Sequence, residues 1–411
     1  MYAGAVPILR LADILGQPTA ASFLKNVVAR GRHANAYLFQ GPAGVGKGTA
    51  ALALARALLC ERVPGGHAER RGPALFDGAP EVPTRGTGAP PPDDACGECS
   101  GCHKTADLQH PDLRFLFPVS GEEKELDETV AETLRVLREE PLFVFAYEKA
   151  ASIRLSLTRE LLRELAYEPF EASRRVVVVR DADRMREDQC SALLKSLEEP
   201  GSTVWILTTS RPARLPATIR SRCQRVRFAP LPEELLQRVL EEKAGVPAPE
   251  ARVLAALAGG SLARALTLRE TEPLRARDEA LALLQPALRG DSAGLWKAAQ
   301  SFMKFGRTGR ESLRRMIEIH QLWLRDLLRV KAGAPREALA NRDREAEIRR
   351  QAETLEAREI RRRLAVLEEA LQSIEGNVTA DLTLFSAMAR VAGARYGEGQ
   401  WPAHPAARWD Y

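Results

Sequence analysis

The run Ala34-Asn-Ala-Tyr-Leu-Phe-Gln40 is followed directly by Gly41-Pro-Ala-Gly-Val-Gly-Lys47, and this stretch decides the fold. The first run has the composition of a short buried strand. Residues 50–59 are almost all Ala, Leu and Arg and have a high helix propensity. The glycine-rich loop therefore joins a strand to a helix. Its pattern, Gly-x-x-x-x-Gly-Lys, indicates a phosphate-binding loop, in which backbone N–H groups surround phosphates and the lysine reaches the β and γ oxygens.

We therefore predict nucleotide binding at this loop. The pattern normally continues with Ser or Thr, whose hydroxyl binds Mg²⁺, but Gly48 stands there and Thr49 follows one place later. Because one helical position is a rotation of about 100°, Thr49 does not substitute directly for that hydroxyl. The candidate nucleotide contacts in the loop are Gly41, Gly44, Gly46, Lys47 and Thr49.

A second strand, residues 174–180, contains four consecutive valines and is followed by Asp181. In NTPases of this kind an acid ending a neighbouring apolar strand is the second Mg²⁺ contact, so Asp181 is the candidate for that role. ATP-hydrolysing enzymes usually continue with Glu, but Ala182 cannot accept a proton from the attacking water. On an extended chain, Asp183 points to a different side from position 182. We expect a degraded Mg²⁺ site that holds ATP or ADP and hydrolyses it slowly or not at all.

Strands and helices alternate in the first half of the chain, and strands then disappear. A third strand, residues 202–209, follows a helix at residues 188–199. This alternation predicts a parallel sheet covered on both faces, so the expected fold class is α/β. After Pro230-Leu-Pro232 we expect helical units at 233–267 and 272–395, with amphipathic runs at 311–330 and 345–373.

The length of 411 residues suggests two to four domains of about 100–200 residues each. A formal charge of +5, from 60 basic and 55 acidic residues, permits nucleic acid as a partner without arguing for it. No stretch approaches the roughly 18 uninterrupted apolar residues of a membrane helix. The N-terminus lacks the charged start and apolar core of a signal peptide, so we expect a cytoplasmic chain with no membrane partner.

Two segments fall outside the periodic pattern. Residues 61–95 are rich in Pro and Gly and have no periodic apolar face, so we expect a flexible surface insertion. The last stretch, residues 397–411, is rich in Pro and Ala and is expected to be a loose tail.

Three cysteines lie close together in the pattern Cys96-x-x-Cys99-x-x-Cys102. Two-residue spacing suits chelation of one tetrahedral Zn²⁺, and a closed structural site needs a fourth ligand. The sequence offers Cys60 and His103 for this place. In a cytosolic chain such a cluster indicates zinc more than a redox centre. The other two cysteines, Cys190 and Cys223, stand alone and are expected to be buried thiols.

Four motifs follow one another in the chain: Asp13-Ile-Leu-Gly-Gln17, residues 33–47, Ala192-Leu-Leu-Lys-Ser-Leu-Glu-Glu-Pro200 and Leu215-Pro-Ala-Thr-Ile-Arg-Ser-Arg-Cys223. In this order they resemble the AAA+ clamp-loader subunits of bacterial DNA polymerase III. The resemblance spans residues 8–270, and residues 377–391 resemble the family's final helix. The Asp181-Ala182 pair, and an end directly after the collar, resemble the delta prime type more than the ATP-hydrolysing gamma/tau type.

This resemblance implies a P-loop AAA+ (RecA-like) core, a small helical lid and a C-terminal all-helical collar through which five subunits form a ring. The implied partners are the gamma/tau and delta subunits and, through the assembly, the sliding clamp and primed DNA at the replisome in the nucleoid. The resemblance also selects Cys60 as the fourth zinc ligand. The implied boundaries are 1–228 for the core, with a zinc module at 60–103 and the insertion at 61–95, then 229–270 for the lid, 271–395 for the collar and 396–411 for the tail.

In this family the arginine of a Ser-Arg-Cys motif reaches the ATP of the neighbouring subunit. The resemblance therefore implies that Arg222 acts in trans as an arginine finger. A guanidinium suits this role because it is planar, permanently charged and donates in pairs to phosphate oxygens. Thr209, with Thr208 beside it, stands where the family has its first nucleotide sensor; the alternative is that both are buried strand threonines without such a role. Arg264 lies near the second sensor position, offset by one residue.

Two other functions are open at this point. One is an ATP-hydrolysing, gamma/tau-like motor subunit, against which the residues at positions 48 and 182 argue. The other is a stand-alone DNA-binding protein. The sequence has no clustered basic stretch with interleaved aromatic residues, and the arginines of its long amphipathic runs alternate with acids, as on solvated helix faces.

Overall fold

The computed structural model describes most of the chain outside the expected insertion and tail. Most of residues 61–95 and all of residues 396–411 lie outside the described part. The chain divides into two compact units, Met1–Pro232 with Ser261–Ala263, and Glu233–Gly260 with Arg264–Tyr411. The described residues are 10–64, 92–119, 126–139, 145, 151–199, 201–270, 272–291, 293–294, 297, 310–375 and 380–393.

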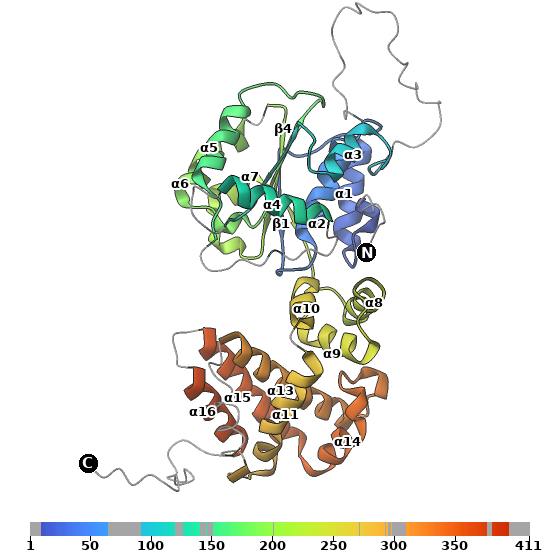
Figure 1. Ribbon diagram of the computed structural model, residues 1–411, viewed down its shortest axis with the longest axis vertical. Helices are drawn as coiled ribbons and strands as arrows, with labels where there is room; N and C mark the ends of the chain where they lie inside the picture. Colours follow the sequence, from blue (N-terminus) through green and yellow to red (C-terminus); the bar gives the residue numbers. More distant parts are fainter. Residues whose placement is uncertain are drawn as a thin grey trace, which may run out of the picture. The chain divides into compact units, whose positions relative to one another are not determined.

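The first unit is built on a five-stranded sheet in the order β2-β3-β4-β1-β5, in which every neighbouring pair is parallel (Figure 1). β1 pairs with β4 on one side and with β5 on the other. Because parallel strands end at the same edge of a sheet, the segments that follow β1, β3 and β4 meet there. The strands are β1 (Ala36–Gln40), β2 (Leu113–Leu116), β3 (Arg175–Val179), β4 (Thr203–Thr209) and β5 (Gln224–Arg227).

Helices cover both faces of this sheet, as Figure 1 shows with α1 on one side and α5 and α6 on the other. Alternate side chains of β1 serve the two faces. Tyr37 and Phe39 belong to the core beneath α1 and α2, whereas Ala36 and Leu38 belong to the core beneath α5, α6 and α7. The helices are α1 (Pro18–Arg30), α2 (Lys47–Leu58), α3 (Ser100–Ala106), α4 (Leu126–Glu139), α5 (Leu155–Glu164), α6 (Glu187–Glu198) and α7 (Ala217–Arg222).

The sequence located three of the five strands. The strands expected at 34–40, 174–180 and 202–209 are β1, β3 and β4, each shorter by one or two residues. β2 and β5 were not predicted from the sequence. β5 carries exposed polar residues around Val226, so its pattern is that of an edge strand with little apolar content. The expected α/β class is nevertheless confirmed, because the sheet is wholly parallel and helices lie on both faces.

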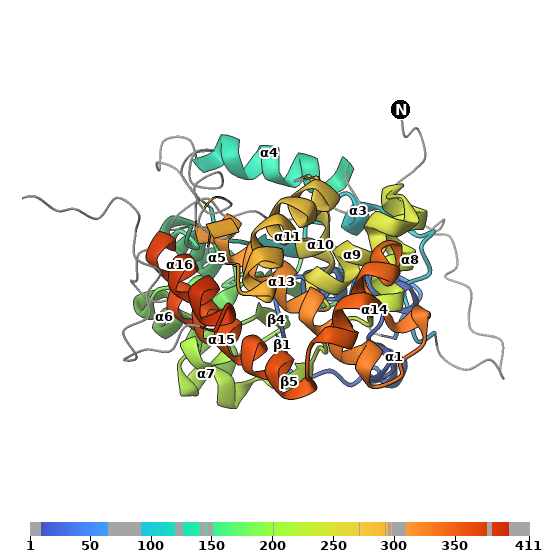
Figure 2. The ribbon, with the colours of Figure 1, turned by 90° about the horizontal axis from the view of Figure 1, so that it is seen from below.

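The described residues of the second unit form helices and 3₁₀ turns and contain no strand. α13 packs against α11, α14, α15 and α16, and Figure 2 shows α13 alongside α11. The amphipathic run 345–373 forms two helices, which separate at Leu355-Glu356. The division of this unit into a lid and a collar stays a prediction. The helices are α8 (Glu233–Ala244), α9 (Ala248–Ala258), α10 (Leu262–Arg269, beginning in the first unit), α11 (Pro273–Arg289), α13 (Arg310–Lys331), α14 (Glu345–Thr354), α15 (Ala357–Glu375) and α16 (Ala380–Val391).

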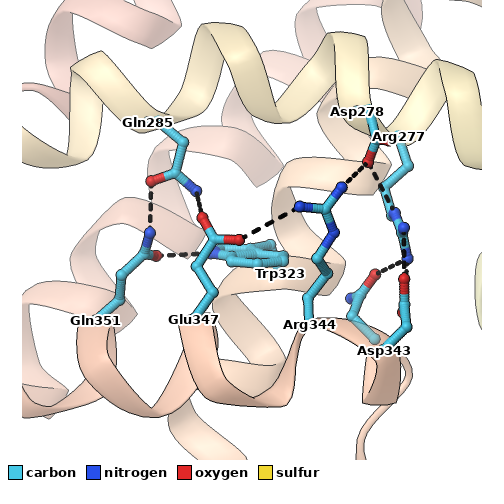
Figure 3. A network of polar contacts seen from close by, with 9 residues as sticks. Arg277, Asp278, Gln285, Trp323, Asp343, Arg344, Glu347 and Gln351 are labelled. Carbon is cyan, nitrogen blue, oxygen red and sulfur yellow. Dashed lines mark hydrogen bonds and ion pairs between the residues drawn. The ribbon is translucent and has the colours of Figure 1, made fainter.

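A polar network fastens α11 to the segment before α14 and to α14 itself (Figure 3). The buried guanidinium of Arg277 donates two hydrogen bonds to the Asp343 carboxylate, at 2.9 and 2.7 Å. Such a two-pronged, charge-assisted contact fixes orientation as well as distance. Further along the same interface, the Trp323 indole N–H donates to Gln351, which in turn donates to Gln285 of α11. The network therefore sets the register between these helices.

Within the described residues, no helix has both the length and the apolar character that a membrane span requires. α13 is long but amphipathic, with basic residues in its last turn.

One polar residue of α13, His320, is fully buried. Its Nε2 lies 2.7 Å from the Ala280 carbonyl oxygen of α11, and its Nδ1 has no hydrogen-bond partner among the residues that the structure describes. The neutral tautomer that donates from Nε2 fits this surrounding.

Burial lowers the pKa of His320 to about 4. Since the unfolded imidazole titrates near 6.5, stability from the neutral ring is fully present above that pH and is lost as pH falls toward 4. Between pH 7 and pH 5 we expect the opening free energy of α13 to drop by on the order of 2 kcal/mol. Amide hydrogen exchange, corrected for intrinsic rates, measures this drop.

The matched variant is His320→Gln, which keeps a donor but does not titrate. Its α13 amides should show a much smaller change in protection between pH 7 and pH 5. Equal changes in the variant and the natural chain would show that another group causes the effect.

Candidate nucleotide site and metal centre

The glycine loop follows β1 at the carboxyl edge of the sheet and ends where α2 begins. Gly41 approaches the chain after β5 so closely that a Cβ would collide with the carbonyl oxygen of Phe228. Gly44 has a φ of +74°, and a Cβ there would collide with Ser261. The backbone N–H of Leu262 donates to the Gly44 carbonyl oxygen at 3.0 Å. The loop is therefore held in shape from both sides by backbone that only glycine tolerates.

Lys47 is the first residue of α2 and is buried, with 6% of its surface exposed. Its ammonium group donates to the carbonyl oxygens of Gly41 at 2.8 Å and of Pro42. Burial lowers the pKa of Lys47 to about 8, because desolvation outweighs the attraction of Asp181. Gly46 caps the helix, and Thr49 lies exposed in its first turn. The ammonium group of Lys47 therefore lies against the start of the loop.

The segment after β3 differs from the sequence expectation. Asp181 adopts a left-handed conformation (φ +47°), and Ala182–Arg184 form a 3₁₀ turn, so the chain is not extended at Asp183. Asp181 donates its backbone N–H to the Thr208 hydroxyl at 3.0 Å. The turn carries the Asp183 side chain inward, where only 1% of it is exposed. The prediction that Asp183 lies on an extended strand was wrong because the strand ends at Val179.

Thr209 ends β4 and is fully buried. Its hydroxyl donates to the Asp183 carboxylate at 2.7 Å and accepts from the backbone N–H of Arg211 at 3.0 Å. The Arg211 side chain completes the arrangement by donating to the other Asp183 oxygen at 2.8 Å. The expected sensor threonine is therefore part of a buried triad. Its role toward nucleotide stays a prediction.

Arg180 also lies at this edge of the sheet, and the sequence did not predict a role for it at the site. It lies between the end of β3 and Asp181, and a Cβ on Gly48 would collide with its guanidinium. Its Nε is 3.5 Å from a carboxylate oxygen of Asp181. Two features of the sequence could have indicated it: Arg180 directly precedes the strand-end acid Asp181, and Gly48 replaces the usual hydroxyl residue after Lys47.

Four sulfur atoms gather beside α2 and α3. The Sγ atoms of Cys60, Cys96, Cys99 and Cys102 all lie within 4.8 Å of one another. The Cys60–Cys99 and Cys96–Cys102 pairs are each 3.9 Å apart. With Zn–S bonds of about 2.3 Å, a tetrahedral site has sulfur–sulfur edges of about 3.8 Å. The cluster is therefore consistent with a structural zinc site.

The surrounding backbone also suits thiolate ligands. The N–H groups of Cys96, Cys99 and Cys102 each point at the sulfur of another cysteine in the cluster, at 3.4 Å. The thiol of Cys102 lowers the pKa of Cys60 by hydrogen bonding to it. His103 is exposed and lies outside the cluster, so the fold brings Cys60, not His103, to the fourth position.

The two lone cysteines are buried, as expected. Desolvation raises the pKa of Cys190 and of Cys223 to about 11, so both stay protonated at neutral pH. Arg222, beside Cys223, is the last residue of α7. It donates to the Thr218 carbonyl oxygen at 2.8 Å and pairs with Glu198, with 34% of its side chain exposed.

The family model described as "DNA polymerase III, delta subunit" matches residues 16–72 and 87–232. The match covers the sheet, the glycine loop, the four cysteines and Arg222. The curated relatives that match include delta prime subunits. The chain belongs to the family of DNA polymerase III delta prime subunits.

Individual relatives agree with this family. The chain is 32% identical over 257 residues to the delta prime subunit of Pseudomonas aeruginosa, which covers 61% of this chain and 60% of that protein. It is 28% identical over 228 residues to that of Bacillus subtilis, covering 55% and 52%. The alignments thus span between half and two thirds of these delta prime relatives. It is also 28% identical over 263 residues to the tau subunit of Escherichia coli, covering 62% and 32%.

Among solved structures, a DNA polymerase III gamma subunit-related protein of Thermotoga maritima aligns with a TM-score of 0.32 at 20% identity, covering 71% of this chain and 97% of that chain. The RuvB branch migration motor of the same organism aligns with a TM-score of 0.38 at 14% identity, covering 85% and 90%. The assignment of this chain to an AAA+-like fold rests on its family, its strand order and its phosphate loop.

We expect purified, reduced protein to contain about one equivalent of zinc, because four thiolates close a tetrahedral site. Cys60→Ser should reduce this content below half and lower the melting temperature of the first unit. Metal analysis and thermal unfolding measure the two effects.

His103→Ala and Cys190→Ala are the controls, and both should keep about one equivalent. Less than half an equivalent in the natural chain, or full zinc content in Cys60→Ser, would contradict a four-cysteine site.

Proposed function

We propose that this chain is a clamp-loader subunit that supports ATP hydrolysis on a neighbour instead of performing it. The observation that carries this proposal is a delta prime-type core that keeps Lys47 and its glycine loop but lacks both groups of the chemical step. Gly48 offers no hydroxyl to a metal, and Ala182 offers no carboxylate to an attacking water. The partners we propose are gamma/tau and delta subunits in a five-membered ring that places a sliding clamp on primed DNA.

Within this function we assign Arg222 the role of the arginine finger. It stands at the end of α7, where its charge is partly exposed. In the isolated chain it is paired with Glu198, whose side chain is 48% exposed. Exposed ion pairs contribute only about 0–1 kcal/mol, so exchange of this partner for a neighbour's phosphate costs little. A phosphate also accepts the paired N–H donors of a guanidinium.

The variant Arg222→Ala should lower the clamp- and DNA-stimulated ATPase of a reconstituted loader by at least about tenfold, since finger arginines contribute roughly 10³-fold or more where they have been removed. The ATPase rate with Arg222→Lys should fall between the rates with the natural chain and with Arg222→Ala, because lysine keeps the charge but not the paired N–H donors. Steady-state phosphate release on the complete assembly gives the rates.

Arg30→Ala is the matched control, since this exposed arginine lies at the end of α1 on the opposite face of the sheet. It should leave the rate unchanged. Glu198→Ala should also preserve activity, because it only removes the resting partner of Arg222. Normal hydrolysis in an assembly that carries Arg222→Ala would overturn the role.

The competing function is that of an ATP-hydrolysing, gamma/tau-like motor. We expect the purified chain alone to show no ATP turnover above that of Lys47→Ala, because the proton acceptor and the metal hydroxyl are absent. A turnover of about 1 s⁻¹ or more that Lys47→Ala abolishes would identify a motor subunit.

A further inference from the structure

The Mg²⁺ position of the phosphate loop is the part of this edge that the residues present do not fit. In P-loop NTPases the ion is held by the hydroxyl after the lysine and by the strand-end acid. Here position 48 has no side chain, and the nearby space belongs to Arg180, since a Cβ on Gly48 would collide with that guanidinium. A guanidinium has donors only and carries a permanent positive charge, so it cannot ligate a cation and repels one.

Arg180 is fixed in this place by contacts on two further sides. Its Cζ lies 3.9 Å from the centre of the Phe145 ring, within the range of a cation–π contact. Its Nε lies 3.5 Å from a carboxylate oxygen of Asp181. About a quarter of the side chain remains exposed, at 26%. The strand-end acid that would attract Mg²⁺ is therefore already neutralised by an arginine of the same chain.

The second cation of the loop is Lys47, which directly precedes Gly48 in the chain. Besides the larger effect of burial, Asp181 raises the pKa of Lys47 and Arg180 lowers it, so both side chains interact electrostatically with its ammonium group. The Lys47 ammonium group lies at the start of the loop, against Gly41 and Pro42, and the Arg180 guanidinium lies at its end, beside Gly48. Two cationic side chains and the backbone N–H groups at the start of α2 thus border the loop. Both cationic side chains can pair with the phosphate oxygens of a nucleoside diphosphate or triphosphate that carries no bound ion. Guanidinium groups donate in pairs to phosphate oxygens, which is the contact that a divalent cation otherwise makes.

We propose that Arg180 takes the place of Mg²⁺, so that this chain binds the polyphosphate of a free nucleotide in the absence of any divalent cation. Gly48 then leaves room for the guanidinium, which occupies the space of the usual hydroxyl side chain. The proposal concerns the chain's own loop and does not depend on Arg222. It also explains why the chain keeps its phosphate loop although it lacks the hydroxyl at position 48 and the carboxylate at position 182.

The test is a titration of the purified full-length chain with fluorescent ADP, followed by anisotropy, in excess EDTA and in excess Mg²⁺. We expect the dissociation constant in EDTA to be equal to or lower than that in Mg²⁺. Arg180→Ala should weaken binding in EDTA by about tenfold or more, the loss of one charge-assisted contact. Lys47→Ala should weaken it under both conditions and so assigns the signal to the loop.

Arg186→Ala is the matched control, because this arginine is six positions away and its side chain is 73% exposed. It should bind as the natural chain does. Circular dichroism and the zinc content of each variant verify folding independently of nucleotide. The double variant Gly48→Thr/Arg180→Val restores the hydroxyl and removes the blocking cation, and its binding should become dependent on Mg²⁺.

Three results would overturn the proposal: binding by the natural chain that requires Mg²⁺, an unchanged affinity of Arg180→Ala in EDTA, or the absence of binding under both conditions. Arg222→Ala serves as a separate reference in this assay and should bind normally. A failure here therefore leaves the arginine-finger role standing, and a failure of that role leaves this proposal standing.

Discussion

The parallel pairing of β1 between β4 and β5 is the constraint on which the rest of the nucleotide site depends. It brings the glycine loop, the turn after β3 and the end of β4 to one edge. β1 is buried on both faces, so a slip in its register would move apolar side chains and the loop together. The close approach of Gly41 to the chain after β5 adds a second restraint at the same point. The fold itself therefore positions these segments, without a ligand.

Some of this arrangement follows from local pattern and some does not. β3 contains four consecutive valines and β4 contains the apolar run 204–207, and continuous runs of this kind are typical of strands covered on both faces. β5 has a single buried residue, Val226, and its pairing with β1 supplies the stability that its composition lacks. The sequence therefore identified the centre of the sheet, whereas its edges depend on contacts between distant segments.

The same distinction holds at the two candidate sites. The spacing of three cysteines suggests a metal, but only the fold places Cys60 within reach of them. The motif around Lys47 predicts a phosphate loop, but the turn at Asp181 and the position of Arg180 depend on backbone angles that no motif encodes. Asp183 illustrates the difference: the sequence predicts an extended chain there, whereas a 3₁₀ turn buries its carboxylate in a triad with Thr209 and Arg211.

The four-cysteine cluster also has a consequence for how this chain tolerates change in length. Cys96 donates its backbone N–H to the sulfur of Cys60, so the two ends of the intervening segment meet at the cluster. Closing a loop costs only about 0.6 kcal/mol more for each doubling of its length. Because the cluster holds the two ends of this segment together, insertions and deletions within it are expected to leave the sheet unchanged. The same place is a natural point for inserting an affinity tag or a fluorescent label into the protein.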